Sequence, residues 1–304
     1  MTTREEPDLW PALDYQASKE TIDALHMRSQ VVGKVKVALT RTAPEWQNVP
    51  LFVSGRGLTT GLLHGGTGGI EIAFDLVDHR LDIATSDGRR EGFELVPSPL
   101  RDFTANVLSA LDRLGVSVKI NPLTVEVPNP VRCDVHEGYD VYDRGVANRL
   151  FRILAQVATV FEDYRAGFWG KQPPVSFWWG TFDLAVTRYN LVAIPPADGM
   201  DLISRVGGDS EQAAVGFWPG NDRYAKPAFF AYTYPKPEGL EGAAVSPDAA
   251  GWNVDVGEFL LDYDDVRVAQ DPRAAISAFA NSTYEAGAKL AGWDRELLER
   301  QPAI

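Results

Sequence analysis

The stretch that decides the fold is Pro174-Val175-Ser176-Phe177-Trp178-Trp179-Gly180-Thr181-Phe182-Asp183-Leu184-Ala185-Val186-Thr187-Arg188-Tyr189, which crowds aromatic and β-branched residues into one run. Such residues favour strands, so we predict a strand over residues 175–189. With a period of two, one face is apolar and carries Trp178, Phe182, Leu184 and Val186. The opposite face is aromatic but also polar, with Phe177, Trp179, Thr181, Asp183 and Tyr189. This pattern predicts a central strand whose second side faces solvent or a ligand.

Helices and further strands are predicted on both sides of this run. Before it, we expect a helix from a Ser18 cap to about Leu39, strands over 51–53, 70–76, 81–85, 92–96 and 116–120, and a helix over 99–114. A helix over 144–168 comes directly before it, and after it we expect strands over 211–218, 228–234 and 258–261 and a helix over 272–291 that Asp271 caps. The sequence therefore predicts an α+β protein.

The two halves repeat the same order of elements, helix, antiparallel strands and helix. A Gln precedes a Pro by 20 residues in the first half (Gln30, Pro50) and by 18 in the second (Gln156, Pro174). On this register Thr59 corresponds to Asp183. We therefore predict an internal duplication with pseudo-two-fold symmetry and helices packed on the sheets. The predicted parts are an arm over 1–14, a first repeat over 15–125, a connector over 126–143 and a second repeat over 144–304, packed as one globular unit.

Charge and composition exclude several function classes. The net charge of −13 argues against binding to nucleic acid or to an anionic membrane, because phosphate groups need a basic surface. No apolar run reaches the roughly 18 residues that a membrane span requires, and residues 1–7 lack the features of a signal peptide. We therefore expect a cytoplasmic protein that acts on a small molecule, with a homodimer as a candidate assembly.

Several motifs occur together and resemble a known family. They include Gln30-Val31-Val32-Gly33-Lys34, Arg56-Gly57-Leu58-Thr59-Thr60, Trp179-Gly180-Thr181-Phe182-Asp183-Leu184-Ala185 and Gly216-Phe217-Trp218-Pro219-Gly220. The chain resembles, from about residue 10 to 299, a bacterial family of unknown function found in actinobacteria and cyanobacteria. In that family a His stands where Ser176 and Ser210 stand here. The resemblance implies that this chain has lost any chemistry which those imidazoles perform, as in a protein recruited to specialised metabolism.

Motifs for common cofactors are missing from the sequence. The run Gly65-Gly66-Thr67-Gly68-Gly69 lacks the Lys-Ser/Thr ending of a phosphate loop and lies between predicted strands. None of the four His shows metal-ligand spacing, although His26 would form a site if Asp75, His79 or Asp183 converged with it. We predict no cofactor and no metal.

Asp183 is the main candidate for chemistry, because a carboxylate within an otherwise apolar strand must be paired or have a raised pKa. We assign it as the catalytic acid or base, with His26, Lys34 and Arg56 orienting the substrate or stabilising charge. A structural salt bridge from Asp183 to Arg56, Arg188 or Lys34 is the alternative. The predicted substrate-binding residues are Gln30, Thr59, Trp179, Thr181, Arg188, Glu211, Trp218 and Tyr232.

Three functions remain open at this stage. The first is a cofactor-independent enzyme that performs acid/base chemistry, such as cyclisation, isomerisation, dehydration or hydrolysis, on a small organic metabolite. The second is a noncatalytic small-molecule-binding or assembly protein, in which the aromatic strand binds a metabolite or a partner. The third is a metal-dependent enzyme.

Overall fold

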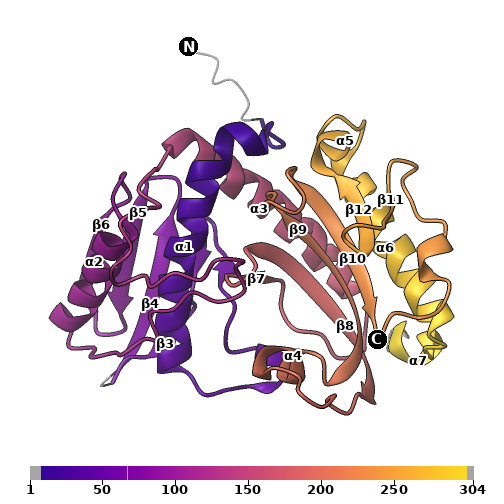
Figure 1. The fold of residues 1–304 in the computed structure, drawn as a ribbon, viewed down its shortest axis with the longest axis horizontal. Coiled ribbons are helices and arrows are strands. Elements are labelled where there is room, and N and C mark those ends of the chain that lie inside the picture. The colour runs from indigo at the N-terminus through magenta and orange to yellow at the C-terminus, as the bar shows by residue number, and fades with distance from the viewer. Residues whose placement is uncertain (1–7, 67, 300–304) are drawn as a thin grey trace.

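The computed structural model describes residues 8–66 and 68–299, and it combines helices with two antiparallel sheets (Figure 1). The predicted α+β class is therefore confirmed. In the described residues, no helix has the length and apolar character needed to cross a membrane. The first seven residues of the predicted arm lie outside the described residues, and residues 8–14 have no helix or strand.

The first sheet contains the strands β1 (Phe52–Val53), β2 (Gly57–Thr59), β4 (Gly69–Asp75), β5 (Arg80–Thr85) and β6 (Arg90–Glu94), in that order. The short β3 (Leu63–His64) also pairs with β4. All pairings are antiparallel, since each strand returns beside the one before it. Apolar side chains alternate along β4 and β5, with Ile70, Ile72, Phe74, Leu81 and Ile83 all buried.

The second sheet contains, in spatial order, β11 (Gly251–Asn253), β12 (Glu258–Asp262), β10 (Ala228–Tyr234), β9 (Ser210–Trp218), β8 (Asp183–Ala193) and β7 (Ser176–Trp178). These strands are antiparallel too. The predictions for β9, β10 and β12 agree with the structure to within one residue at each end. Strand β11 was not predicted, because a three-residue strand is too short to show a period.

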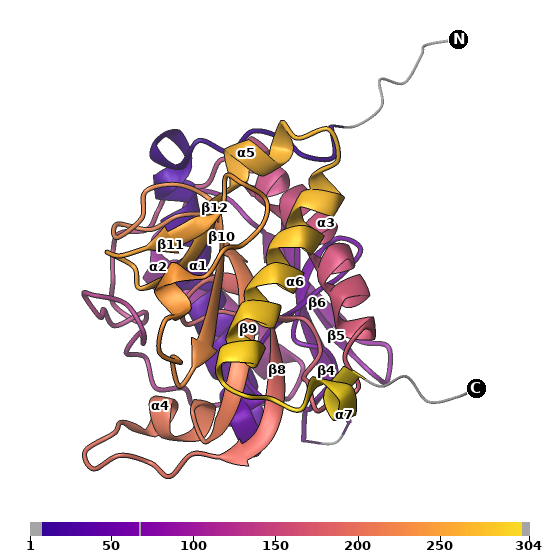
Figure 2. The same cartoon turned by 90° about the vertical axis from the view of Figure 1, so that its right-hand side faces the viewer.

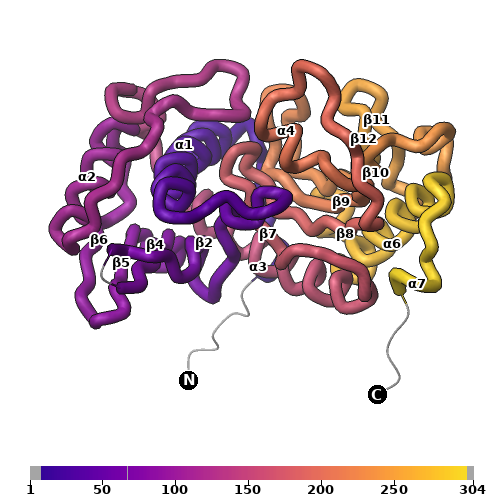
Figure 3. The backbone as a smooth tube through the Cα atoms, turned by 90° about the horizontal axis from the view of Figure 1, so that it is seen from below, coloured from indigo at the N-terminus to yellow at the C-terminus, as the bar shows by residue number. Residues whose placement is uncertain are grey.

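Four long helices cover the sheets: α1 (Tyr15–Leu39), α2 (Leu100–Arg113), α3 (Arg144–Ala166) and α6 (Pro272–Leu290). Helices α1 and α2 pack together on the first sheet, and α3 packs against α6 beneath the second (Figures 2 and 3). Short helices are α4 (Leu202–Gly207), α5 (Tyr263–Arg267) and α7 (Arg295–Glu299), with 3-10 turns η1 (Pro44–Trp46) and η2 (Leu240–Gly242).

Helix α1 begins four residues before the predicted start, because Asp14 and not Ser18 is its cap. The Asp14 side chain accepts a hydrogen bond of 2.8 Å from the backbone N–H of Ala17. Asp271 caps α6 as predicted, through the backbone N–H of Ala274. The strand predicted over residues 116–120 is wrong, since this segment has no strand partner.

The predicted single strand over 175–189 is also wrong, because the run is a hairpin. Strand β7 ends at Trp178, a turn covers residues 179–182, and β8 begins at Asp183, so that Trp178 pairs with Asp183. Phe182 takes a left-handed backbone conformation (φ 62°) in the turn. The turn changes the period, and therefore Trp178 lies on the same face as Asp183 and not with Leu184 and Val186.

The two sheets meet where residue 51 crosses β7. The backbone N–H of Leu51 donates to the carbonyl of Phe177 (2.9 Å), and that of Phe177 donates to the carbonyl of Leu51 (2.8 Å). Nearby, the Trp179 indole N–H donates to the Val49 carbonyl (2.9 Å), and the Lys36 ammonium donates to the carbonyls of Pro50 and Thr60. Both halves are thereby joined through β1 and β7.

Both halves contain a long helix, a meander of strands and a second helix, in that order. They differ in that a short helix, α5, lies between the last strand and the last long helix of the second half, and Thr59 ends β2 while Asp183 begins β8. The internal duplication and the proposed division into two repeats stay predictions.

The contact between α1 and the β7–β8 turn gives a test of this joint. A Cβ atom at Gly33 would lie 2.3 Å from ring atoms of Trp179, so alanine cannot fit unless the helix or the indole moves. We expect Gly33→Ala to lower the unfolding free energy in urea by roughly 1–3 kcal/mol. Gly207→Ala is the control, since its Cβ would meet only an ordinary contact at 3.8 Å. Equal stability of the two variants would contradict the proposed joint.

Candidate functional site

The second sheet has two unlike faces. On one face, Arg188 and Thr233 point to the helices: the Arg188 guanidinium lies 3.5 Å from the Tyr164 ring centre on α3, and Thr233 contacts Gly287 on α6. On the other face, Ala185, Gly216, Phe230 and Leu260 lie in register on neighbouring strands, and Asp183 lies on the same side of β8, two residues before Ala185. We call this second face the open face, because several of its large side chains, including Trp178, Trp218 and Tyr232, remain half-buried.

Three aromatic rings form a ladder on the open face. The rings of Trp218 and Phe230 are stacked, with centres 4.8 Å apart and planes at 15°. Phe230 and Tyr232 continue the series with centres 6.5 Å apart and planes at 6°. Tyr224 adds an edge contact to Trp218. Phe230, the middle ring, is buried, whereas Trp218 and Tyr232 are half-buried, so the two end rings of the ladder remain accessible to a planar or apolar molecule.

Asp183 lies beside the Trp218 end of the ladder, at the start of β8. Its side chain is only 7% exposed, and its Oδ1 accepts a hydrogen bond from the Thr181 hydroxyl. The described residues form no ion pair with it. Burial raises the pKa of Asp183 to about 7, and the carboxylates of Glu126 and Glu258 add to the rise. A carboxyl group with this pKa can both accept and donate a proton near neutral pH.

Glu258 lies next to Tyr232, on the adjacent strand β12, at the other end of the ladder. Burial raises the pKa of Glu258 to about 7, while the charge of Arg223 opposes the rise. Its Oε2 atom is buried and has no hydrogen-bond partner among the described residues, and the same holds for the indole Nε1 of Trp218. Two unsatisfied polar atoms on one face are uncommon in a folded protein and require an explanation.

Glu126 brings a third carboxyl group to this region from the segment between the halves. It takes a left-handed conformation (φ 56°), and its carboxylate lies against Gly180, where a Cβ would be 1.9 Å from Oε2. The pKa of Glu126 is raised by desolvation and by the charge of Asp201, although its side chain is exposed. An alanine at residue 180 would therefore displace the Glu126 carboxylate, which is the far end of a flexible and exposed side chain.

Of the residues assigned from sequence, Thr181, Trp218 and Tyr232 lie near Asp183 or on the same face. His26 and Gln30 do not contact Asp183 directly, but both form hydrogen bonds to the β7–β8 turn that precedes it. His26 Nε2 lies 2.9 Å from the Gly180 carbonyl, which requires the proton on Nε2, and burial lowers the pKa of this imidazole. Gln30 donates to the carbonyls of Val125 (2.7 Å) and Gly180 (3.3 Å).

Lys34 and Trp179 belong to the joint between the halves. The Lys34 ammonium lies 5.8 Å from the Trp179 ring centre, and burial lowers the pKa of Lys34. The Trp179 side chain is buried against Gly33 and donates to Val49. Neither side chain faces the ladder, so we assign them to the packing of α1 on the turn.

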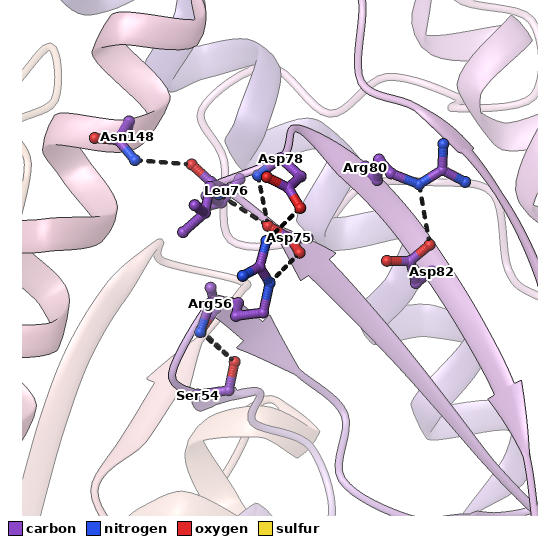
Figure 4. A network of polar contacts seen from close by, with 10 residues as sticks. Ser54, Arg56, Asp75, Leu76, Asp78, Arg80, Asp82 and Asn148 are labelled. Atoms are coloured by element: carbon purple, nitrogen blue, oxygen red, sulfur yellow. Dashed lines mark hydrogen bonds and ion pairs between the residues drawn. The ribbon is translucent and has the colours of Figure 1, made fainter.

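Arg56 is not near Asp183, because it belongs to a separate network in the first sheet (Figure 4). It forms ion pairs with Asp75 and Asp78, and the backbone N–H groups of Val77 and Asp78 donate to the same Asp75 carboxylate. The Arg56 ion pair lowers the pKa of Asp75 against the effect of burial. Thr59 donates to Glu71 in the same sheet. This network fixes the turn between β4 and β5.

Arg188 and Glu211 also lie away from Asp183. Arg188 is enclosed by the rings of Tyr164, Phe168 and Tyr284 and donates to the Tyr164 carbonyl (2.6 Å), on the helix-covered face. Glu211 accepts a hydrogen bond of 2.6 Å from Asn190. No cation proposed as an ion-pair partner for Asp183 thus contacts it.

Comparison with known proteins gives one match. The model of the family of unknown function DUF5996 matches residues 10–300. The chain belongs to this family. Neither the curated proteins nor the solved structures contain a match.

The site of this DUF5996 protein includes residues that the sequence did not indicate. These are Trp178, Phe230, Glu126 and Glu258. Phe230 and Tyr232 alternate along β10, and that period was a usable signal for Phe230. Glu126 lies in a Pro-rich connector and Glu258 at a strand end, where no pattern marks either. Within residues 8–66 and 68–299, no group of three or more His, Cys, Asp and Glu side chains is arranged to hold a metal ion.

The raised pKa of Asp183 gives a test by protein stability. The folded pKa of about 7 exceeds the unfolded value, so the free energy of unfolding falls as pH rises from about 4 to 7. The loss of stability is complete above about pH 7 and is absent below about pH 4. We expect Asp183→Asn to raise the unfolding free energy by about 2 kcal/mol near pH 8 and by little near pH 4.5. Urea denaturation at both pH values measures the difference. A variant that is less stable than the wild type at pH 8 would show that Asp183 is paired in the fold; Asp112→Asn, an exposed carboxylate on α2, is the control.

Proposed function

We propose that this protein is a cofactor-independent enzyme that performs acid/base chemistry on a small organic metabolite. The observation that carries the proposal is Asp183: a carboxyl group 7% exposed, without an ion pair among the described residues, at the edge of an aromatic face. A buried carboxylate with no cation costs stability, and proteins retain such groups at functional sites more often than elsewhere.

Asp183 and Glu258 take the roles of proton-transferring groups in this proposal. Both have a pKa of about 7, so each is present in both protonation states near neutral pH. The ladder of Trp218, Phe230 and Tyr232 holds the substrate between them. Thr181 orients Asp183, and His26 positions the turn that carries Thr181. Such a pair of groups can perform cyclisation, isomerisation, dehydration or hydrolysis. In this proposal the enzyme acts in the cytoplasm and belongs to specialised metabolism.

A noncatalytic metabolite-binding protein is the second candidate. It is favoured by the half-buried ladder and by the unsatisfied indole N–H of Trp218, which a bound molecule would satisfy without any reaction. In that case the raised pKa values would affect the pH dependence of binding only. The experiment below separates the two functions.

A planar benzisoxazole is a direct probe of the proposed base. The carboxylate removes the proton from the ring carbon, the carbon–nitrogen bond becomes a nitrile, and the nitrogen–oxygen bond breaks to release a phenolate. We expect the protein to accelerate this reaction with a rate that rises as pH passes about 7. Asp183→Asn should lower the rate by roughly 10²-fold, as followed by phenolate absorbance.

Glu162→Gln is the matched control, because this carboxylate lies on α3, beneath the opposite face, and pairs with Arg165. It should leave the rate unchanged. If Asp183→Asn and Glu162→Gln have equal rates while both variants are folded, the proposed acid/base role of Asp183 is wrong and the binding function is favoured.

A further inference from the structure

Acidic groups outnumber basic groups around the open face. Carboxyl groups come from three elements: Glu126 from the connector, Asp183 from β8 and Glu258 from β12. On the positive side, Lys226 is neutralised by its ion pair with Asp262, which also accepts a hydrogen bond from the Tyr224 hydroxyl. Arg223 donates to the backbone carbonyls of Asp255 and Val256, at 2.7 and 2.9 Å. The face therefore has an excess of negative charge near neutral pH.

The unsatisfied carboxyl oxygen of Glu258 indicates which chemical group can bind beside it. The buried Oε2 of Glu258 is an acceptor with no donor among the described residues. Among the described residues, Arg223 is the cation whose charge acts on Glu258, and its guanidinium donates to main-chain carbonyls, so a bound molecule can supply the donor. A protonated amine provides both an N–H donor and a positive charge.

The ladder determines the rest of that molecule. The two half-buried end rings of the ladder, Trp218 and Tyr232, offer stacking surface and negative ring faces that attract cations, whereas Phe230 between them is buried. An anionic ring compound would meet three carboxyl groups and be repelled. The net charge of −13 further concentrates cations near the surface.

We infer that the open face binds a small ring compound carrying a protonated amine, with its ring on the Trp218–Phe230–Tyr232 ladder and its ammonium group on Glu258. This inference rests on the proposed function because it concerns the same face of the sheet, and it adds the chemical class of the substrate. Asp183, at the other end of the ladder, lies beside the ring and not beside the ammonium group.

The test uses three probes with one ring and different charge: benzylammonium, benzyl alcohol and benzoate. Calorimetry measures their affinity, and the indole N–H resonance of Trp218, identified by its loss in Trp218→Phe, reports contact. We expect benzylammonium to bind at least tenfold more tightly than benzyl alcohol, and benzoate not to bind. Glu258→Gln should weaken benzylammonium binding by about tenfold or more, and Glu162→Gln should leave it unchanged.

Affinity for benzylammonium should also fall between pH 8 and pH 5, because the raised pKa values of Asp183 and Glu258, both about 7, neutralise these groups over that range. Tyr232, whose pKa burial raises, stays neutral throughout. Equal affinity for benzoate and benzylammonium, equal affinity of wild type and Glu258→Gln, or no benzylammonium binding at millimolar concentration would each overturn the inference.

The two proposals fail separately. If the ammonium probe binds but the benzisoxazole is not turned over, the acid/base role of Asp183 is lost and the ligand class stands. If the benzisoxazole is turned over in an Asp183-dependent manner but the ammonium probe does not bind, the ligand class is wrong and the catalytic role stands.

Discussion

The pair of backbone hydrogen bonds between Leu51 and Phe177 is the constraint on which the rest of the structure depends. It joins two antiparallel meanders that otherwise lie on separate parts of the chain. Backbone groups at a sheet edge must find partners, and here each half satisfies the edge of the other. Helix α1 then packs over the junction, where Gly33 allows the Trp179 indole to approach its backbone.

The junction also explains where polar groups are tolerated. Trp179 and Phe182 are used for packing in the β7–β8 turn, and His26 and Gln30 satisfy the Gly180 carbonyl from above. With its backbone held in this way, the turn places Thr181 and Asp183 at the edge of the open face. Asp183 is thus buried at the joint without a salt bridge, and its pKa is raised. Asp75 is paired with Arg56, and its pKa is lowered.

Much of the fold could be predicted from periodicity. The spans of α2, α3, α6, β9, β10 and β12 followed from apolar spacing and capping residues, because these elements each bury one continuous stripe or face. The hairpin at 179–182 was missed since Gly180 and Thr181 look like strand residues between aromatics, and only the pairing of Trp178 with Asp183 shows the turn. Asp183, Trp218 and Tyr232 were found as polar or amphipathic residues within apolar strands. Sequence gives no distances between residues far apart in the chain. The proposed pairing of Asp183 with Arg56, Arg188 or Lys34 was therefore wrong.

By itself, the sequence determined the fold class, most of the elements and the carboxylate most in need of explanation. Local patterns suffice for these, since hydrophobic period and capping act over a few residues. The tertiary structure alone decided which groups meet Asp183. Strand order brings Glu258 from β12, the connector brings Glu126, and the register places Trp218, Phe230 and Tyr232 in one ladder. Contacts between residues far apart in the chain depend on how sheets pair and helices pack, and no local pattern encodes that geometry.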